Sequence, residues 1–345
     1  MRRLVATTIV LLCLGFAGSA SAAPRSFYGL VASADPTATE FERMGSARVG
    51  TLRLNFSWES VQHSGPDQPY DWSRYDSLIG AAAKQGIRVL PTIFSSPGWA
   101  AAKPHHPPRP GSMDEYREFV RAASARYGSN GMFWLLNPLT PKVPILDWQV
   151  WNEVNSPSFW HPKPNPKAYK RLLLVTNSGL EAGDPQARVM LAGLFRSPRI
   201  KNGIWLKKYL PGLYKAKGKP LFDSVAIHPY APTPKRTLNS VLEARKIMSR
   251  FKDKRKPIWL TEVGWATGGQ KTPLTVSRKK QAKYLSQLYK LMRQNRGRHK
   301  IGGVLWYSVR DLPGSIWFNN TGLFTTGGSA KPGWAAYARV AGGSP

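Results

Sequence analysis

Short apolar segments alternate with helical patterns along nearly the whole chain, and this alternation limits the fold more than any other feature. Eight segments rich in β-branched and aromatic residues are predicted strands: 27–32, 50–55, 88–94, 146–151, 188–194, 224–228, 258–262 and 303–308. Their continuous apolar character is typical of strands that are buried on both faces, as in parallel sheets.

Helical patterns fill the gaps between these segments. Ser112 and Glu115 predict a capping box ahead of an apolar stripe that ends at Tyr127, and a second stripe lies within 285–292. Weaker patterns cover 39–44, 73–84, 168–181, 205–214, 238–251 and 333–340. Eight strand and helix pairs in 345 residues predict an α/β protein with a (β/α)8 TIM barrel fold. A doubly wound sheet is the alternative, but no G-x-G-x-x-G or Walker motif follows a strand.

The first 22 residues have the pattern of a secretory signal peptide. Two arginines precede an apolar run at 4–17, and small residues at 20–22 form a cleavage signal. This run is shorter than the ~20 residues that a membrane-spanning helix needs. We therefore expect a signal peptide at 1–22, a single barrel domain at 23–345, export to the extracellular space or cell envelope, and no transmembrane segment after cleavage.

The chain is strongly basic, because 50 Lys and Arg residues against 19 Asp and Glu residues give a net charge of +31. Such a charge attracts polyanions. The basic residues are scattered or lie on expected solvent faces, and no zinc-finger or RNA-recognition signature accompanies them. We interpret the charge as an exterior suited to anionic cell-surface polymers. Nucleic-acid binding is the minor alternative, and we expect no nucleic-acid partner. The only cysteine, Cys13, falls in the signal peptide, which leaves no thiol for catalysis, disulfides or zinc.

Two glutamates, Glu153 and Glu262, stand where the fourth and seventh predicted strands end, and tryptophans flank both. One such glutamate would be structural about half the time. Two of them at the carboxyl ends of barrel strands face a common site. Glycoside hydrolysis requires two carboxyl groups across one bond, one protonated and one ionised. We expect Arg53, at the end of the second strand, to keep Glu262 ionised, and the aromatic surroundings of Glu153 to raise its pKa.

With these residues the sequence resembles the clan A glycoside hydrolases, a large group of retaining (β/α)8 enzymes. Cellulase-like members of family 5 and the family 39 enzymes are the most similar. The resemblance rests on five strand ends in order: Arg53, Asn152-Glu153, His228-Pro229-Tyr230, Glu262 and Trp306-Tyr307.

The resemblance implies that Glu153 is the general acid/base and Glu262 the nucleophile. It also implies that Arg53 and Tyr230 orient Glu262 and hold its charge. Such a retaining mechanism uses no cofactor and no metal. It requires carboxyl groups about 5 to 5.5 Å apart, whereas a separation near 9 Å would favour inversion.

Other residues are expected to contact the sugar. By the resemblance, Asn152 would bind the sugar 2-hydroxyl, His228 would line the cleft, and Trp306 would be the platform beneath the sugar. Trp58 and Trp99 lie just beyond strand ends and are further candidates, with ordinary packing as the equal alternative. His105-His106 has no nearby carboxylate, so we expect no metal site there.

These features predict a secreted retaining glycosidase that acts on a poly- or oligosaccharide, which the basic exterior suggests is anionic. The alternative is a catalytically inactive glycan-binding barrel of the cell envelope. A third interpretation is a polyanion-binding surface protein whose barrel is incidental. The residues do not name the sugar or its linkage, because barrels of one fold differ in their loops.

Overall fold

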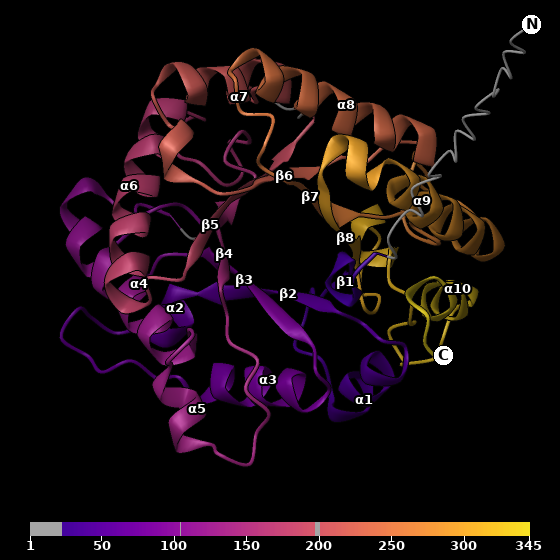
Figure 1. Ribbon diagram of the computed structural model, residues 1–345, viewed down its shortest axis with the longest axis horizontal. Helices are drawn as coiled ribbons and strands as arrows, with labels where there is room; N and C mark the ends of the chain where they lie inside the picture. Colours follow the sequence, from indigo (N-terminus) through magenta and orange to yellow (C-terminus); the bar gives the residue numbers. More distant parts are fainter. Residues whose placement is uncertain (1–22, 104, 197–200) are drawn as a thin grey trace, which may run out of the picture.

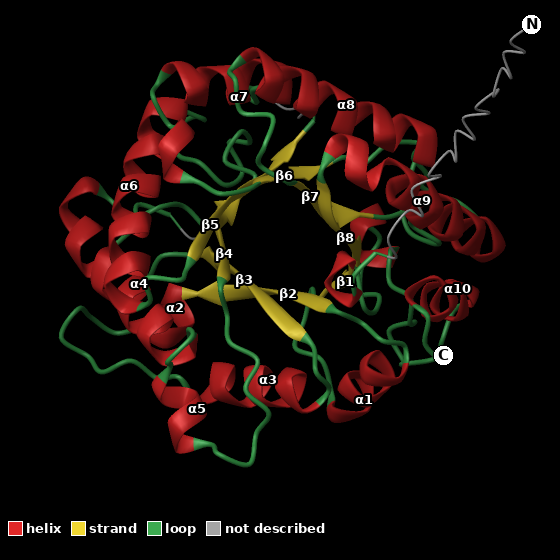
Figure 2. Cartoon of the chain, in the orientation of Figure 1, coloured by secondary structure: helices red, strands yellow, loops and turns green. Residues whose placement is uncertain are grey.

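The computed structural model describes residues 23–103, 105–196 and 201–345, in which eight parallel strands form a closed ring inside a layer of helices (Figures 1 and 2). Each strand pairs with the next in the chain, and β1 pairs with β8 to close the barrel. The strands are β1 (Tyr28–Val31), β2 (Thr51–Ser57), β3 (Arg88–Phe94), β4 (Asp147–Asn152), β5 (Arg188–Phe195), β6 (Val225–His228), β7 (Ile258–Val263) and β8 (Ile301–Tyr307). The predicted (β/α)8 TIM barrel is confirmed.

The expected helices are present in the outer layer; the helix predicted at 73–84 has the predicted bounds, and the ends of the others are shifted. They are α1 (Ala38–Ser46), α3 (Ser73–Lys84), α4 (Met113–Tyr127), α6 (Pro166–Gly183), α7 (Leu206–Lys215), α8 (Pro234–Arg250), α9 (Arg278–His299) and α10 (Pro332–Ala341). Two short helices, α2 (Trp58–Val61) and α5 (Met132–Leu136), were not predicted, because each is too short for a helical period to show. Short 3-10 turns are η1 (Arg25–Phe27), η2 (Pro110–Ser112), η3 (Lys219–Leu221) and η4 (Trp317–Asn320).

The predicted capping box at the start of α4 is wrong. Ser112 ends the turn η2 with φ −117° and ψ 23°, and its side chain makes no cap hydrogen bond. A capping side chain requires an extended backbone at that position. The structure instead shows a capping box at α1. The Glu40 backbone N–H donates to the Thr37 hydroxyl oxygen at 3.2 Å, and the Thr37 backbone N–H donates to the Glu40 carboxylate at 2.8 Å.

The strands carry two different faces, as the alternation of side chains requires. On β2, Phe56 points outward and packs on Tyr75 with ring centroids 4.2 Å apart, while Arg53 is buried inside the barrel. A small apolar cluster separate from the main core, which we assign to the barrel interior, contains Val31, Leu90, Met190, Ala226 and Leu305. The polar residues of the interior therefore require partners within the barrel, and these partners lead to the site described below.

The predicted signal peptide at 1–22, with Cys13, lies outside the described residues, so the domain boundary after residue 22 stays a prediction. Within the residues that the structure describes, none of the helices combines the length and the apolar character needed to cross a membrane.

Candidate active site

The predicted site residues meet toward one end of the barrel, where the strands have their carboxyl ends. Glu153 follows β4, His228 ends β6 and Glu262 lies near the end of β7. Arg53 lies within β2 and not at its end as predicted, because β2 continues to Ser57. Arg53 and Glu262 are 209 positions apart in the chain, yet their Nη1 and Oε1 atoms are 2.7 Å apart. The barrel thus assembles in space what the sequence distributes over most of its length.

His228 bridges the two glutamates. Its Nδ1 atom lies 2.9 Å from Oε1 of Glu153 and 3.5 Å from Oε2 of Glu262. One carboxylate oxygen of each glutamate and a ring nitrogen of His228 all lie within 4.8 Å of one another. The glutamate side chains are 16% and 12% exposed, so both are largely withdrawn from water but remain open to a ligand.

Fixed hydrogen-bond donors surround Glu262. Arg53 binds one carboxylate oxygen, and the Tyr230 hydroxyl donates to the other at 2.9 Å. Burial and the charge of Glu262 raise the pKa of Tyr230, so its hydroxyl keeps the proton that it donates. Burial alone would raise the pKa of Glu262, but His228, Arg53 and the Tyr230 hydrogen bond together outweigh it and hold this pKa below its usual range. Of the two carboxyl groups, Glu262 is therefore the one that ionises at lower pH.

Glu153 has the opposite shift. Burial raises its pKa above the usual range, the negative charge of Glu262 adds to this effect, and His228 opposes it. The backbone around Glu153 is also unusual, because Trp151 and Glu153 have φ values of 70° and 36°, in the left-handed region. Such residues cost about 1 to 3 kcal/mol each and cluster at functional sites. Glu153 therefore keeps its proton to higher pH than Glu262 does, and it is held by a backbone that the surrounding fold must stabilise.

A buried polar chain supports the pair from below, and the sequence analysis missed it. Gln149 Oε1 accepts a hydrogen bond of 2.6 Å from Nε of Arg53. Because a guanidinium can only donate, the amide nitrogen of Gln149 must face the other way, where it donates to Thr261 Oγ1 at 3.1 Å. The Thr261 hydroxyl in turn lies 3.1 Å from Nε2 of His228. A glutamine between the apolar residues Trp148 and Val150 of the fourth strand was the signal available in the sequence.

His228 does not line the cleft as predicted. Its side chain has no exposed surface and lies beneath the two carboxylates, because both ring nitrogens are engaged by protein groups. Gly193 on β5 makes room for the ring, since a Cβ atom there would lie 1.9 Å from Nε2 of His228. A glycine in a strand interior often marks such a close approach. His228 is thus a bridging and positioning residue, and Gly193 is a second residue that sequence reasoning missed.

Asn152 is positioned for the predicted contact with a sugar hydroxyl. Its Oδ1 atom accepts a 2.8 Å hydrogen bond from Nη2 of Arg53. This contact fixes the orientation of the amide, since the guanidinium cannot accept. Within the described residues Nδ2 of Asn152 donates to no protein group, so it is available to a ligand.

Two of the predicted sugar contacts are wrong, because their rings are buried. Trp306 has no exposed surface, and its indole N–H donates to the Thr321 carbonyl at 3.0 Å. Trp58 is 1% exposed and stacks on Phe119 on the outer side of the barrel, with ring centroids 5.7 Å apart. Trp99 is half-buried against Trp58 and keeps an exposed part, so its role stays a prediction.

Two other aromatic rings lie next to residues of the site. Tyr307, the residue after Trp306, is half-buried. Burial is the main cause that raises its pKa, and the negative charge of Glu262 is the second. Trp317, from η4, packs edge-on against Tyr230 with ring centroids 5.2 Å apart and is also half-buried. Because sugar C–H faces stack on aromatic rings, Tyr307 and Trp317 replace Trp306 and Trp58 as candidate contacts.

A family model described as the glycosyl hydrolase catalytic core matches residues 150–337. The chain belongs to this family. The matched region contains Glu153, His228 and Glu262, while Arg53 lies before it. The prediction of a glycosidase is therefore confirmed at the level of the family. A comparison with curated protein sequences finds no match.

Solved structures of glycosidases share the fold. A family 39 glycoside hydrolase from Bacteroides cellulosilyticus has a TM-score of 0.70 and 20% identity, over 92% of this chain and 64% of that one. A glucosidase from Croceicoccus marinus has a TM-score of 0.70, 14% identity and coverages of 92% and 67%. A β-xylosidase from Caulobacter crescentus has a TM-score of 0.64, 18% identity and coverages of 90% and 67%. The chain spans about two thirds of these proteins, and the resemblance to clan A glycoside hydrolases is confirmed in the fold.

The cluster of Glu153, His228 and Glu262 also has donor atoms close enough to hold a metal ion. Two observations disfavour this use. Arg53 places a fixed positive charge 2.7 Å from Glu262, which would repel a cation. Both His228 nitrogens already have protein partners, so ligation would break a hydrogen bond. The arrangement fits a pair of carboxyl groups with different proton affinities better than a metal site.

Proposed function

We propose that the chain is a retaining glycosidase in which Glu153 is the general acid/base and Glu262 the nucleophile. One observation carries the proposal: two carboxyl groups with oxygens within 4.8 Å have pKa values shifted in opposite directions by their surroundings. Paired groups of this kind divide the acid and the nucleophilic role at one pH.

In the first step, an ionised oxygen of Glu262 attacks the anomeric carbon of the bound sugar. The bond to the leaving oxygen breaks while Glu153 gives its proton to that oxygen. Arg53 and Tyr230 keep Glu262 ionised and aimed before the attack. Asn152 is placed by Arg53 to donate to a hydroxyl of the same sugar. The products are a free leaving group and a glycosyl ester on Glu262.

In the second step, Glu153 changes from acid to base as a result of the first step. In the free protein, the negative charge of Glu262 helps to raise the pKa of Glu153. Ester formation removes this charge. The pKa of Glu153 therefore falls in the intermediate, and its carboxylate can take a proton from water. The water oxygen attacks the anomeric carbon, and the ester bond to Glu262 breaks. The sugar product leaves with its original anomeric configuration, and Glu262 is again a carboxylate.

The separation of the carboxyl groups supports retention. An inverting enzyme needs about 6.5 to 9.5 Å between its carboxyl groups so that a water molecule fits between them and the sugar. The closest arrangement of the glutamates, within 4.8 Å, is on the scale of a retaining pair.

The substrate proposal stays at the level of a poly- or oligosaccharide. The net charge of +31 supports an anionic polymer or an anionic envelope as the setting. The signal-like pattern at 1–22 supports export to the extracellular space or cell envelope.

The test is a release assay on aryl glycosides and on neutral and acidic polysaccharides, with Glu153→Gln and Glu262→Gln beside the parent. Glu42→Gln, an exposed glutamate on α1, is the matched control. We expect activity in the parent and the control only, and retention of configuration in the first product seen by NMR. A mechanism-based 2-fluoroglycoside should label Glu262.

Two outcomes would contradict the proposal. An inverted product would exclude the ester on Glu262. A parent that binds a glycan without cleaving any member of the panel would favour the inactive glycan-binding barrel.

A further inference from the structure

A cluster of exposed hydrophobic side chains lies on α5 and the turn that follows it. Leu139 is 98% exposed, Leu135 70%, Leu136 64% and Met132 51%. These are four of the nine large hydrophobic side chains exposed within the described residues, and they fall in eight consecutive positions. Single exposed leucines are ordinary, but a contiguous patch marks an interaction site.

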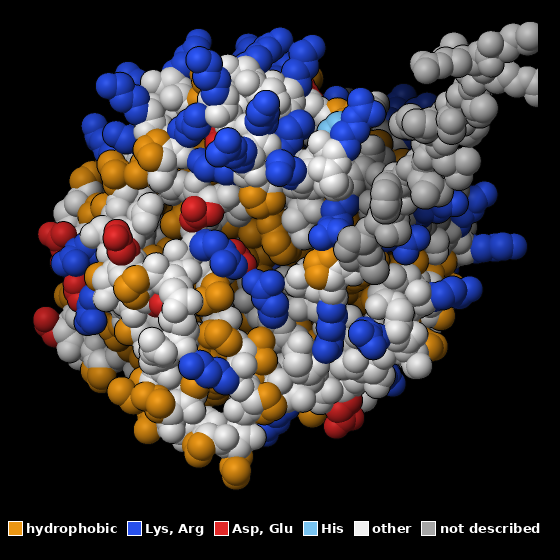
Figure 3. Space-filling view, viewed as in Figure 1, with side chains coloured by type: hydrophobic (Ala, Val, Ile, Leu, Met, Phe, Trp, Pro, Cys, Tyr) orange, Lys and Arg blue, Asp and Glu red, His pale blue; other side chains and the backbone are white. Residues whose placement is uncertain are grey.

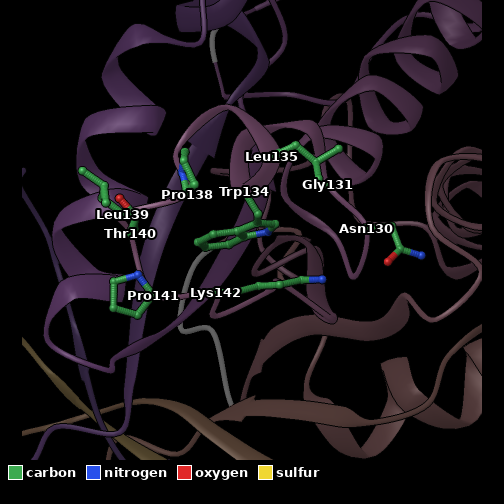
Figure 4. A pocket seen from close by; sticks show the side chains of 9 residues that line it. All are labelled: Asn130, Gly131, Trp134, Leu135, Pro138, Leu139, Thr140, Pro141 and Lys142. Atoms are coloured by element: carbon green, nitrogen blue, oxygen red, sulfur yellow. The ribbon is translucent and has the colours of Figure 1, made fainter.

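The leucines are presented by a fixed base. Their neighbours Phe133 and Trp134 are buried, and the Trp134 indole N–H donates to the carbonyls of Tyr127 and Gly128 at 3.1 and 3.2 Å. Beside the Trp134 ring is a pocket of about 440 Å³, which Leu135, Leu139 and Lys142 help to line (Figure 4). Because Phe133 and Trp134 anchor this segment, the leucines on its outer side stay exposed to solvent.

The same end of the barrel is cationic. The α5 segment leads into β4, so it lies with the other helix-to-strand turns at the amino-terminal end. Exposed Lys and Arg side chains occur in these turns at Lys142, Lys217, Lys252, Lys254, Arg255 and Lys300. Between α7 and β6 and between α8 and β7, the one exposed acidic residue is Asp223. Figure 3 shows Lys and Arg side chains gathered over α7 and α8 and hydrophobic ones over α5.

We propose that the amino-terminal end of the barrel docks on an anionic lipid membrane, with the leucines of α5 inserted among the lipids and the basic turns at the headgroups. Basic residues near an anionic bilayer and apolar side chains that enter it are the two contributions that bind peripheral proteins. Glu153 and Glu262 lie at the opposite end of the barrel, so a docked molecule keeps its cleft open to solvent.

The chemistry favours a membrane over the other possible occupants. A soluble polyanion would match the basic turns but would leave Leu135, Leu136 and Leu139 in water. A second copy of the chain would cover the leucines but would bring two cationic ends together. A membrane with acidic headgroups satisfies the leucines and the charges at once.

The test measures binding of the chain Ala23–Pro345, which contains all eight strands, to sedimented vesicles. The vesicles are phosphatidylcholine alone or phosphatidylcholine with one third phosphatidylglycerol. We expect binding to the anionic vesicles that salt weakens, and little binding to the neutral ones. The variant with Leu136→Gln and Leu139→Gln should bind at least about tenfold more weakly. The variant with Lys142→Glu, Lys254→Glu and Arg255→Glu should lose about 100-fold.

Matched controls separate this surface from general charge and general hydrophobicity. Leu174→Gln removes an exposed leucine from α6, and the set Lys271→Glu, Arg278→Glu and Lys279→Glu reverses three exposed charges at the other end of the barrel. We expect the leucine control to bind as the parent does and the charge control to lose less than about fivefold. Thermal melts of all variants check that each remains folded.

Three results would overturn the proposal. Equal losses in the two charge variants would mean that the attraction has no preferred face. Parent-like binding by the leucine variant, together with equally tight binding to soluble dextran sulfate, would identify a polyanion site. Absence of binding to the anionic vesicles would reject a lipid surface outright.

Discussion

The ends of β4 and β7 carry the same residue type in two different surroundings. Glu153 and Glu262 are similarly buried, at 16% and 12% exposure, and both contact His228. Burial acts to raise the pKa of each glutamate, although the overall shift of Glu262 is downward. What separates them is the set of fixed donors: Arg53 and Tyr230 bind Glu262, and Glu153 has the histidine as its side-chain partner.

The comparison shows that burial alone does not assign catalytic roles. A buried carboxyl group becomes an acid where desolvation dominates and a nucleophile where charge and hydrogen bonds outweigh it. The active form carries one proton for the pair. Activity should therefore rise with pH as Glu262 loses its proton and fall at higher pH as Glu153 loses its own, which gives a bell-shaped profile.

The largest expected effect is that of Glu262→Gln. An amide cannot form the glycosyl ester, so kcat should fall about 10⁴-fold or more on every substrate, whatever its leaving group. The measurement is kcat on a series of aryl glycosides whose leaving groups differ in acidity. A loss that shrinks for the better leaving groups would show that Glu262 is not the nucleophile.

Glu153→Gln should cost less and should behave differently across the same series. General acid catalysis contributes about 10²- to 10⁴-fold, and a good leaving group does not need it. We therefore expect a large loss for poor leaving groups and a small loss in glycosylation for nitrophenyl-type ones. The basic limb of the pH profile should also disappear. If the two glutamine variants respond identically to the leaving group, the assignment of separate roles fails.

The strand pattern was readable from the sequence because each strand is a local apolar run between turn residues, and all eight were found. The two glutamates were readable as a pair: one glutamate at a strand end would be structural about half the time, but two at the carboxyl ends of strands of one barrel face a common site. The prediction for Trp306 failed because adjacent residues of a strand point to opposite faces, and Trp306 lies on the outer face. Tyr307 pairs with the interior residue Val31, whereas Trp306 pairs with Leu30 of the outer core.

The contacts that tune the site were not readable from local patterns. Gln149 meets Arg53 from β2 and Thr261 from β7, at chain separations of 96 and 112 residues. Trp58 is a bulky residue at a strand end, as a sugar contact would be, but the start of α2 turns its ring toward α4. Only the closed barrel decides which of these side chains meet.

Arg53→Lys should make the two carboxyl groups more alike. The lysine cannot keep contacts with Glu262, Gln149 and Asn152 at once, because it lacks the forked donor geometry of the guanidinium. The pKa of Glu262 should rise, so the acid limb of the kcat/KM profile should move to higher pH. We expect a loss of about 10²-fold at the parent's optimum. Arg74→Lys, at an exposed ion pair with Asp35, is the control and should leave the profile unchanged.

Gln149→Met tests whether the comparison extends one layer below the carboxyl groups. The substitution roughly keeps the volume but removes the donor to Thr261, so the Thr261 hydroxyl is no longer oriented toward Nε2 of His228. It also removes the acceptor of Arg53 Nε, and the Gln149→Glu variant below separates the two losses. His228 Nδ1 faces Glu153, and the basic limb of the pH profile should therefore move more than the acid limb. We expect kcat to fall about tenfold with little change in KM.

Gln149→Glu and a thermal melt complete this last test. The glutamate keeps an acceptor for Arg53 but cannot donate to Thr261 in its ionised form, so it should reproduce the shift of the basic limb. A purely structural role would lower the melting temperature of both variants and leave both limbs of the profile in place. A shifted basic limb in folded variants would instead mean that the difference between Glu153 and Glu262 is set partly by a residue that touches neither of them.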